Sequence, residues 1–258
     1  MPAEQYGAGP ALEAAAGLGP YFAWQPRRTA AGWRPLADLL EPEVIAERVT
    51  AGQQVIMRMS GLGPDQIGER VVASTIFLGL AARLLSPLLG AAALTGVVPL
   101  ADPGRLWWRP VEGGPVPIAY DSLHRAGGDA GGVLTRTAVV GLVGPVLEVF
   151  RHRFTLSPQV LWGNVASALG GAAGMIADNA GDPAAAERAA TTVAEMLTVP
   201  PLAGMATLHH PDPDRDRWFL VRRNCCLYYR IPGGGTCGDC VLTPEAERRD
   251  YWERFLQR

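Results

Sequence analysis

The cysteines of this chain are confined to one short segment near its C-terminal end. All four lie between residues 225 and 240, as Cys225, Cys226, Cys237 and Cys240, and their spacing is C-C-x10-C-x2-C. Disulfides that stabilise secreted proteins are usually distributed so that they close long loops, whereas clustered cysteines in a reducing compartment indicate metal binding. Four thiolates suit a [2Fe–2S] cluster, a [4Fe–4S] cluster or a structural Zn²⁺ ion.

The adjacent pair Cys225-Cys226 is the unusual half of this motif. Neighbouring side chains on a regular strand point to opposite faces, so both thiols can bind one site only if the backbone bends there or if the site is broad enough to be reached from both. Structural zinc sites usually space their first two ligands by two to four residues, which argues against an ordinary zinc finger. Pro232 and the three glycines after it allow the chain to reverse and bring the C-x2-C half back.

Composition excludes several kinds of chemistry. The 258 residues are 48% hydrophobic and 19% charged, which is a globular balance. All 23 basic residues are arginine, so a P-loop lysine, a pyridoxal Schiff base and a lysine general base are excluded. With a net charge of −2, the chain has no basic field for nucleic acid. Its first residues lack a basic region followed by a strong apolar core, so we expect no signal peptide and a cytoplasmic protein.

The hydrophobic periodicity predicts a mainly α protein of the α+β class, a helical body with a β-hairpin and a small C-terminal module. We divide the chain into a flexible N-terminal arm at 1–30, a mainly helical body at 31–213 and a metal-binding module at 214–258. Strands at 106–109 and 116–120 should form the hairpin, and a strand at 218–221 should precede the cysteines. Helices are expected to begin near Glu41, Ser157-Pro158, Asp182-Pro183 and Thr243-Pro244.

The most apolar part of the chain is an uncharged run between Arg83 and Asp102. A membrane span needs about 20 predominantly apolar residues. This run is short, is diluted by alanine and glycine, and contains Pro87 and Pro99. We therefore expect a pair of buried helices, the first ending near Leu85 and the second starting at Pro87, with at most peripheral membrane association.

The helix after Ser157 should carry two different faces. Leu161, Val165, Ala168 and Ala172 form an apolar stripe. A second stripe of small residues should let another helix approach closely, and it lacks the preceding strand and the G-x-G-x-x-G spacing that dinucleotide binding needs. This second stripe consists of Gly163, Ser167, Gly170 and Gly174.

At this point the C-C-x10-C-x2-C motif resembles that of the FhuF-like ferric siderophore reductases, a family of similar chain length. Trp162-Gly163-Asn164 and the apolar helix from Val71 also resemble that family. The resemblance implies that Cys225, Cys226, Cys237 and Cys240 hold a [2Fe–2S] cluster. It makes 214–258 an iron–sulfur module and 31–213 a siderophore-binding body.

The activity implied is one-electron reduction of ferric siderophores, which releases Fe(II) in the cytoplasm. The chain has no flavin or nicotinamide fingerprint, so the electron must come from an external donor, such as a ferredoxin or a flavin-dependent reductase. Beyond the cluster itself, no catalytic side chain is required.

Other residues are candidates for tuning the cluster or binding the substrate. Arg222, Arg223 and Arg230 flank the cysteines, where they either favour the more negative reduced cluster or form a solvated face. Trp108 and Arg109 suggest an aromatic and cationic wall for a siderophore, although paired tryptophans on a hairpin are more often core.

The cysteine motif is also compatible with two other kinds of site. The cysteines could hold a structural Zn²⁺ ion in a siderophore-binding or scaffold protein, or the vicinal thiols could form a reversible disulfide in a redox sensor. Two histidines could replace two cysteines as in a Rieske centre. Since four thiolates already complete the ligand set, we expect His209 and His210 to be loop residues.

Overall fold

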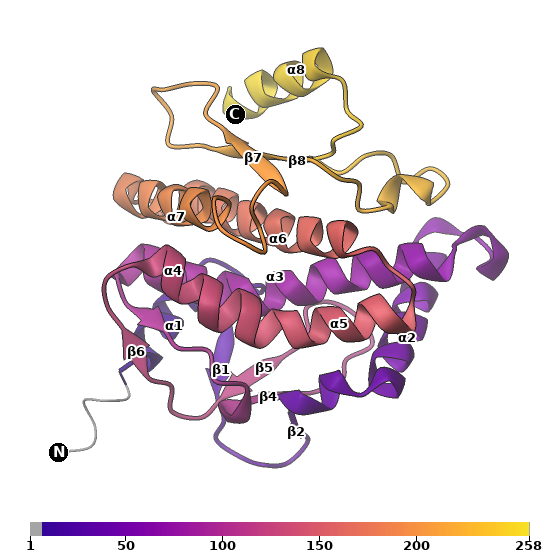
Figure 1. The fold of residues 1–258 in the computed structure, drawn as a ribbon, viewed down its shortest axis with the longest axis horizontal. Helices are drawn as coiled ribbons and strands as arrows, with labels where there is room; N and C mark the ends of the chain where they lie inside the picture. Colours follow the sequence, from indigo (N-terminus) through magenta and orange to yellow (C-terminus); the bar gives the residue numbers. More distant parts are fainter. Residues whose placement is uncertain (1–6, 258) are drawn as a thin grey trace.

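A helix of 27 residues, α3 (Glu69–Thr95), runs through the middle of the molecule. The computed structural model describes residues 7–257. Helices α6 (Pro158–Asn179) and α7 (Pro183–Met196) pack on one side of α3, and a small sheet lies on the other side (Figure 1). The mainly α, α+β class is confirmed. The remaining helices are α1 (Gly9–Ala16), η2 (Leu36–Leu40), α2 (Pro42–Ser60), η3 (Pro64–Gln66), η4 (Pro103–Arg105), α4 (Ala130–Leu134), the π-helical η5 (Thr135–Val143), α5 (Gly144–Arg153), η6 (Tyr228–Arg230) and α8 (Glu245–Leu256).

The prediction of two helices separated at Pro87 is wrong, because α3 continues through this proline. A proline inside a helix removes the hydrogen bond to the carbonyl four residues earlier, which here belongs to Arg83. That carbonyl instead accepts a hydrogen bond from Trp24 Nε1 at 3.0 Å. A partner distant in the sequence therefore replaces the bond that the proline cannot make.

Arg83 itself is buried, with 3% of its surface exposed. Its guanidinium donates to the carbonyls of Val116 at 2.6 Å, of Tyr21 at 3.0 Å and of Ala23. Burial lowers the pKa of Arg83 to about 10, so it stays protonated at neutral pH. It thereby fastens the N-terminal segment and the sheet to α3.

Three helices are long and apolar enough to cross a membrane, by length and composition only: Glu69–Thr95, Ala130–Arg153 and Pro158–Asn179. In the apolar window of the first, 78% of the residues are buried inside the protein, against 50% and 67% for the other two. The expected burial of the apolar run is therefore confirmed. Peripheral membrane association stays a prediction.

The prediction of a flexible arm is wrong for residues 9–26; residues 1–6 lie outside the described part of the chain. In α1, Leu12 and Ala15 are fully buried, and the helix packs on α3. The following strand, β1 (Trp24–Pro26), pairs in parallel with β5. In the sequence, the low charge and frequent alanine of residues 9–26 are typical of a loose segment. In the structure, the small apolar residues of α1 pack against α3.

The predicted hairpin is confirmed by strands β4 (Leu106–Trp108) and β5 (Ile118–Tyr120), which pair antiparallel with Leu106 opposite Tyr120. They lie within a four-stranded sheet of order β1-β5-β4-β2, completed by β2 (Arg34–Pro35). Two further short strands, β3 (Val98–Pro99) and β6 (Arg125–Ala126), form a separate pair.

Two of the predicted helix starts have the expected side-chain caps, whereas α2 and α8 begin near the predicted residues without a side-chain cap. Ser157 Oγ accepts a hydrogen bond from the Val160 N–H at 3.3 Å, and Asp182 Oδ1 accepts one from the Ala184 N–H at 3.0 Å. Pro145 lies in the first turn of α5, directly after the π-helical segment. A change of helical form therefore accommodates this proline.

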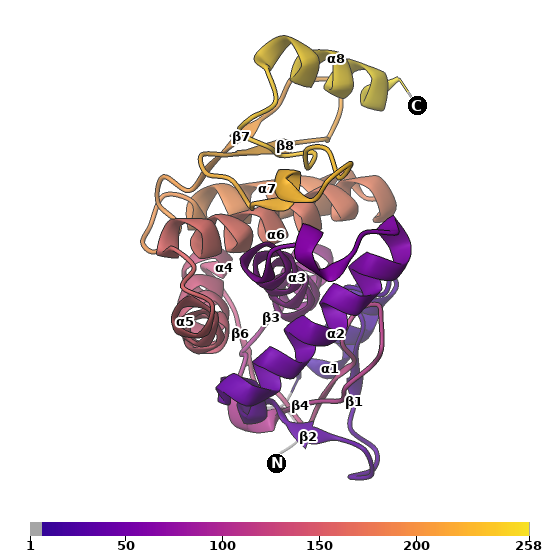
Figure 2. The ribbon, with the colours of Figure 1, turned by 90° about the vertical axis from the view of Figure 1, so that its right-hand side faces the viewer.

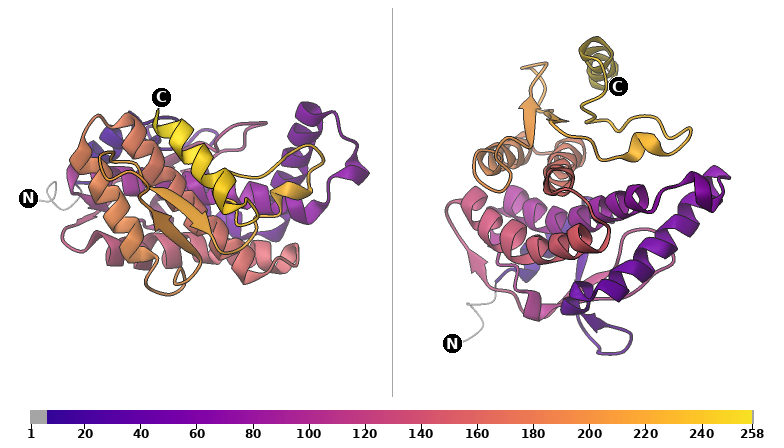
Figure 3. Two further views of the ribbon diagram at one scale, coloured as in Figure 1. Left: turned by 90° about the horizontal axis from the view of Figure 1, so that it is seen from above. Right: turned by 45° about the vertical axis from the view of Figure 1, so that its right-hand side comes forward.

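The C-terminal part forms a layer across α6 (Figure 3). Strands β7 (Ala206–His209) and β8 (Phe219–Arg222) pair antiparallel, and α8 covers them. Trp252 of α8 stacks on Phe219 with ring centroids 5.2 Å apart, and with Val221 they form a second, small core. The predicted strand and final helix are confirmed.

The small-residue stripe of α6 receives this layer rather than another helix, which corrects our prediction. A methyl group on Gly170 would lie 2.5 Å from Leu220 Cδ1, and substituents on Gly163 and Gly174 would collide with the side chains of Asn224 and Arg217. The stripe therefore lets β8 and the residues on both sides of it approach the α6 backbone.

We expect Gly170→Ala to destabilise the protein by about 1–3 kcal/mol, since Leu220 must move to admit the new methyl group. The neighbouring Gly171→Ala is the matched control: nothing lies within 4 Å of its methyl position, and alanine should stabilise the helix by about 0.5–1 kcal/mol. Thermal unfolding of both variants checks the prediction. A lower midpoint for Gly171→Ala than for Gly170→Ala would contradict this packing.

Candidate metal centre

The four cysteines lie on the loop that follows β8, above α6 and close to α3. The loop passes through the short helix η6 before it returns to α8 (Figure 2). It is held down on α3 by a hydrogen bond of 2.7 Å from Ser74 Oγ to the carbonyl of Cys226. One helix of the body therefore fixes the adjacent-cysteine half directly.

The backbone bend that the adjacent cysteines require is present. Strand β8 ends at Arg222, so neither Cys225 nor Cys226 is part of a regular strand. Leu227, the next residue, has a φ of +71°, in the left-handed region that non-glycine residues rarely adopt. Its N–H donates to Cys225 Sγ at 3.2 Å, and the N–H of Leu242 donates in the same way to Cys240 Sγ at 3.4 Å.

The motif folds back so that its two halves meet. Cys226 Sγ and Cys237 Sγ are 3.6 Å apart. Two thiolates on one tetrahedral metal lie roughly 3.8 Å apart, because each metal–sulfur bond is about 2.3 Å long. The Cys226–Cys237 pair thus has the separation that a shared metal ion needs.

The thiols differ in exposure and in acidity. Cys226 and Cys240 are buried, whereas Cys225 and Cys237 are half-buried and form the accessible side of the site. The hydrogen bond with Cys237 and, to a smaller degree, the nearby charge of Arg222 lower the pKa of Cys226 to about 6. The same contact with Cys226, followed by burial, raises the pKa of Cys237. Burial also raises the pKa of Cys225.

The three flanking arginines have different environments. Arg222 is 1% exposed and contacts Asp239, which lies between the last two cysteines; its Nε is 3.1 Å from Asp239 Oδ2. Arg223 and Arg230 are exposed, and Arg230 is 3.3 Å from the hydroxyl of Tyr229. The sequence does not indicate which of the three arginines is buried, because the burial of Arg222 depends on its contacts with α6, which is distant in the sequence.

Asn164 links the site to the body. Its side chain is fully buried; Oδ1 accepts a hydrogen bond from Arg222 Nη2 at 2.6 Å, and Nδ2 donates to the Ser74 carbonyl at 2.9 Å. In the sequence, Asn164 is distinguished by being a polar residue within a helix rich in alanine and glycine.

The structure does not bring Trp108 and Arg109 to the cysteines. Trp108 is 1% exposed and lies in the sheet on the far side of α3 from β8, so the core interpretation of this residue is confirmed and the siderophore-wall interpretation is wrong for it. The guanidinium of Arg109 lies over the ring of Trp33, 5.1 Å from its centroid, in the same region.

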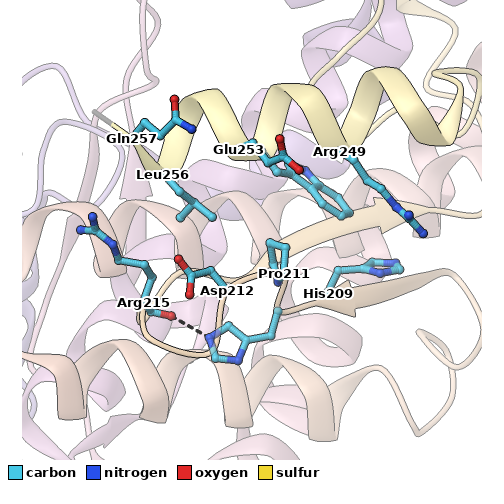
Figure 4. Close-up of a pocket in the computed structure, with 10 residues that line it drawn as sticks. His209, Pro211, Asp212, Arg215, Arg249, Glu253, Leu256 and Gln257 are labelled. Atoms are coloured by element: carbon cyan, nitrogen blue, oxygen red, sulfur yellow. Dashed lines mark hydrogen bonds between the residues drawn. The ribbon is translucent and has the colours of Figure 1, made fainter.

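The two histidines lie at a separate cavity of about 680 Å³ between α8 and the end of β7 (Figure 4). His209 is the last residue of β7 rather than part of a loop, which corrects our prediction, and its ring is 5.3 Å from that of Trp252. His210 stacks on Trp218 and donates from Nε2 to the carbonyl of Arg215 at 2.6 Å. No cysteine lines this cavity.

Residues 222–242 match the family model described as the FhuF 2Fe-2S C-terminal domain. The cysteine segment is similar to a FhuF-type iron–sulfur domain. The resemblance to the FhuF-like family is thereby confirmed for the cysteine region, and the cofactor implied is an iron–sulfur group. No curated protein matches the chain.

The residues of this segment fit such a group. Two sulfurs already accept backbone N–H bonds, and Arg222 Nη1 is a buried N–H group without a hydrogen-bond partner among the described residues. An anionic sulfur-rich group would satisfy that donor. In the described part of the chain, no three His, Cys, Asp or Glu side chains are gathered around one point that could hold a single ion. Cys226 and Cys237, whose sulfurs are 3.6 Å apart, have the separation that an iron–sulfur group needs of two ligands on one metal.

Proposed function

We propose that the chain is a one-electron oxidoreductase that reduces ferric siderophores with a [2Fe–2S] cluster held by Cys225, Cys226, Cys237 and Cys240. The observation that carries the proposal is the meeting of the two motif halves at Cys226 and Cys237, 3.6 Å apart, within a FhuF-type domain. When bound, the cluster supplies single electrons at a potential set by its protein surroundings.

The chemistry of the substrate explains why one electron is enough. A siderophore binds Fe³⁺ through hard oxygen donors and binds Fe²⁺ far less tightly, because the lower charge weakens each bond to oxygen. Reduction of the bound ferric iron therefore releases it, and no side chain of the chain has to act as an acid or a base.

A cavity of about 590 Å³ beside Cys237 is the docking place that we propose for the siderophore. It is lined by Cys237 and Gly238 of the motif and by residues of α8, including Arg248, Tyr251 and Arg254. Its volume is in the range of small-molecule sites, about 300–1,000 Å³. Since Cys237 is one of the two half-exposed thiols, a molecule here would lie next to the accessible side of the site.

The remaining parts of the proposal concern partners and location. The electron comes from an external ferredoxin or flavin-dependent reductase, because the chain has no dinucleotide-binding fingerprint. We place the protein in the cytoplasm, with at most peripheral membrane association, and expect no contact with nucleic acid.

A single-turnover experiment tests the function. Anaerobically purified protein, chemically pre-reduced and mixed with a ferric siderophore and a ferrous chelator, should yield one Fe(II) per cluster and then stop. NADH alone should yield none, and an external reductase should sustain turnover. Hydroxamate, catecholate and carboxylate siderophores are compared in the same assay. If none reoxidises the protein faster than buffer does, the reductase proposal fails.

The same assay tests whether the siderophore binds in the cavity beside Cys237. Tyr251→Ala removes a side chain that lines the cavity, so it should raise the siderophore concentration needed for the half-maximal rate. His152→Ala, on the exposed end of α5, is the control and should leave that concentration unchanged. Equal behaviour of the two variants would place the substrate elsewhere.

A further inference from the structure

A buried arginine connects the cysteine loop to the helical body. Arg222 is the last residue of β8, and its side chain is fully inaccessible to water. Burial of a charged group costs several kcal/mol unless the charge is paired and hydrogen-bonded. The contacts that compensate for its burial therefore indicate what this residue does.

Its first set of contacts reaches the C-x2-C turn. The Arg222 Nε lies 3.1 Å from Asp239 Oδ2, and the Arg222 N–H donates to the Asp239 carbonyl at 3.0 Å. Asp239 directly precedes Cys240 in the turn that begins at Cys237. The main chain and the side chain of Arg222 therefore both contact Asp239, and together they hold the C-x2-C half of the motif in place.

Its second set of contacts reaches the body and returns to the other half. Arg222 Nη2 donates to Asn164 Oδ1 at 2.6 Å and to the Gly163 carbonyl at 3.2 Å. Asn164 Nδ2 donates to the carbonyl and to the hydroxyl of Ser74, at 2.9 and 3.0 Å. The Ser74 hydroxyl donates to the Cys226 carbonyl. Both halves of the motif are therefore tied to the same asparagine on α6.

One part of the guanidinium remains available to the metal centre. Nη1 has no hydrogen-bond partner among the described residues, although it is buried. The guanidinium lies beside the motif, because its Nε is 3.1 Å from Oδ2 of Asp239, which directly precedes Cys240. A cluster gains one negative charge when it is reduced, and a buried positive charge beside it stabilises that state.

We propose that Arg222 is a positioning residue that joins the two halves of the motif to the body, and that its charge raises the reduction potential of the bound cluster. The proposal rests on the cysteine ligand set and not on the identity of the substrate. Arg223 and Arg230 have no comparable effect, because water screens exposed charges.

The experiment measures the midpoint potential by spectroelectrochemistry and the EPR signal of the reduced protein, with no siderophore present. Arg222→Gln should shift the equilibrium toward the oxidised cluster by about tenfold, which is about 59 mV for one electron. Arg222→Lys keeps the charge and should restore most of the potential. Arg223→Gln is the matched control on the neighbouring, exposed residue, and it should leave both readouts unchanged.

The outcomes separate the two parts of the proposal. Loss of the cluster from Arg222→Gln supports positioning, and Asn164→Asp then decides the part about charge. It retains Arg222 but places a carboxylate 2.6 Å from its Nη2, which should lower the potential. An unchanged potential in a cluster-loaded Arg222→Gln or Asn164→Asp protein would overturn the electrostatic role. Unchanged EPR and cluster retention in Arg222→Gln would overturn the positioning role. Failure of siderophore reduction would affect neither.

Discussion

Replacing Cys226 by serine should remove the cluster. Cys226 is buried, its sulfur lies 3.6 Å from that of Cys237, and its carbonyl is fixed by Ser74. A serine hydroxyl is a poorer ligand for iron than a thiolate. Because the hydrogen bond from Ser74 fixes the backbone at residue 226, the backbone cannot shift to bring the hydroxyl closer to the metal. Loss of a neighbour that only hydrogen-bonds a ligand costs about 10–100-fold in metal affinity, so loss of the ligand itself should cost more. Iron and acid-labile sulfide per chain, with the visible spectrum, check the result.

The control for this variant is Thr236→Ser, beside Cys237 on the exposed part of the loop. It also places a serine in the motif region, yet it should keep the iron and sulfide of the unaltered protein, about two of each per chain for a [2Fe–2S] cluster. A Cys226→Ser protein with unchanged spectrum and iron content would show that only one of the adjacent cysteines is a ligand. Stoichiometric zinc without sulfide in the unaltered protein would contradict the cluster itself.

Replacing Arg83 by methionine should cause the largest loss of stability in the helical body. The guanidinium donates to the carbonyls of Val116, Tyr21 and Ala23, and methionine fills a similar volume without replacing these bonds. A buried acceptor left without a partner costs about 1–3 kcal/mol, so three of them should reduce the free energy of unfolding by roughly 3 kcal/mol or more. For a protein of this size, the midpoint of thermal unfolding should fall by roughly 6–12 °C.

Arg70→Met is the control on the same helix, because Arg70 is exposed in the first turns of α3. Its effect on the free energy of unfolding should stay within about 0.5 kcal/mol. Equal midpoints for the two variants would show that the three carbonyls find other partners, water included, when Arg83 is absent.

The parts of the fold that the sequence predicts correctly depend on neighbours in the chain. The cap at Ser157 and the hairpin of β4 and β5 need only nearby residues, and both are present. The bend after Cys226 is one of the two arrangements that the sequence left open, since adjacent side chains on a strand diverge. The resemblance of the cysteine motif to the FhuF-like family likewise depends on a short segment, and the family model matches residues 222–242.

The wrong predictions depend on contacts between distant segments. Pro87 does not end α3, because Trp24 supplies a donor to the freed carbonyl. Nothing near Gly170 in the sequence indicates that Leu220 will pack against it. The burial of Arg222 and the exposure of Arg223 are not apparent from the sequence, because they depend on the contacts of Arg222 with α6. In these cases the deciding contact joins residues far apart in the sequence, whereas the correction for His209 comes from its pairing with Phe219 on the neighbouring strand.

The hydrogen-bonded chain from Ser74 through Asn164 to Arg222 has a consequence for the order of assembly. The cysteines are close enough in sequence for a short peptide to gather them, whereas Ser74, Asn164 and Arg222 come together only after long loops have closed. A nascent or unfolded chain can therefore hold iron through its thiols without the surroundings that the folded body provides. Cluster insertion should therefore yield its native spectrum only on chains whose body has already folded.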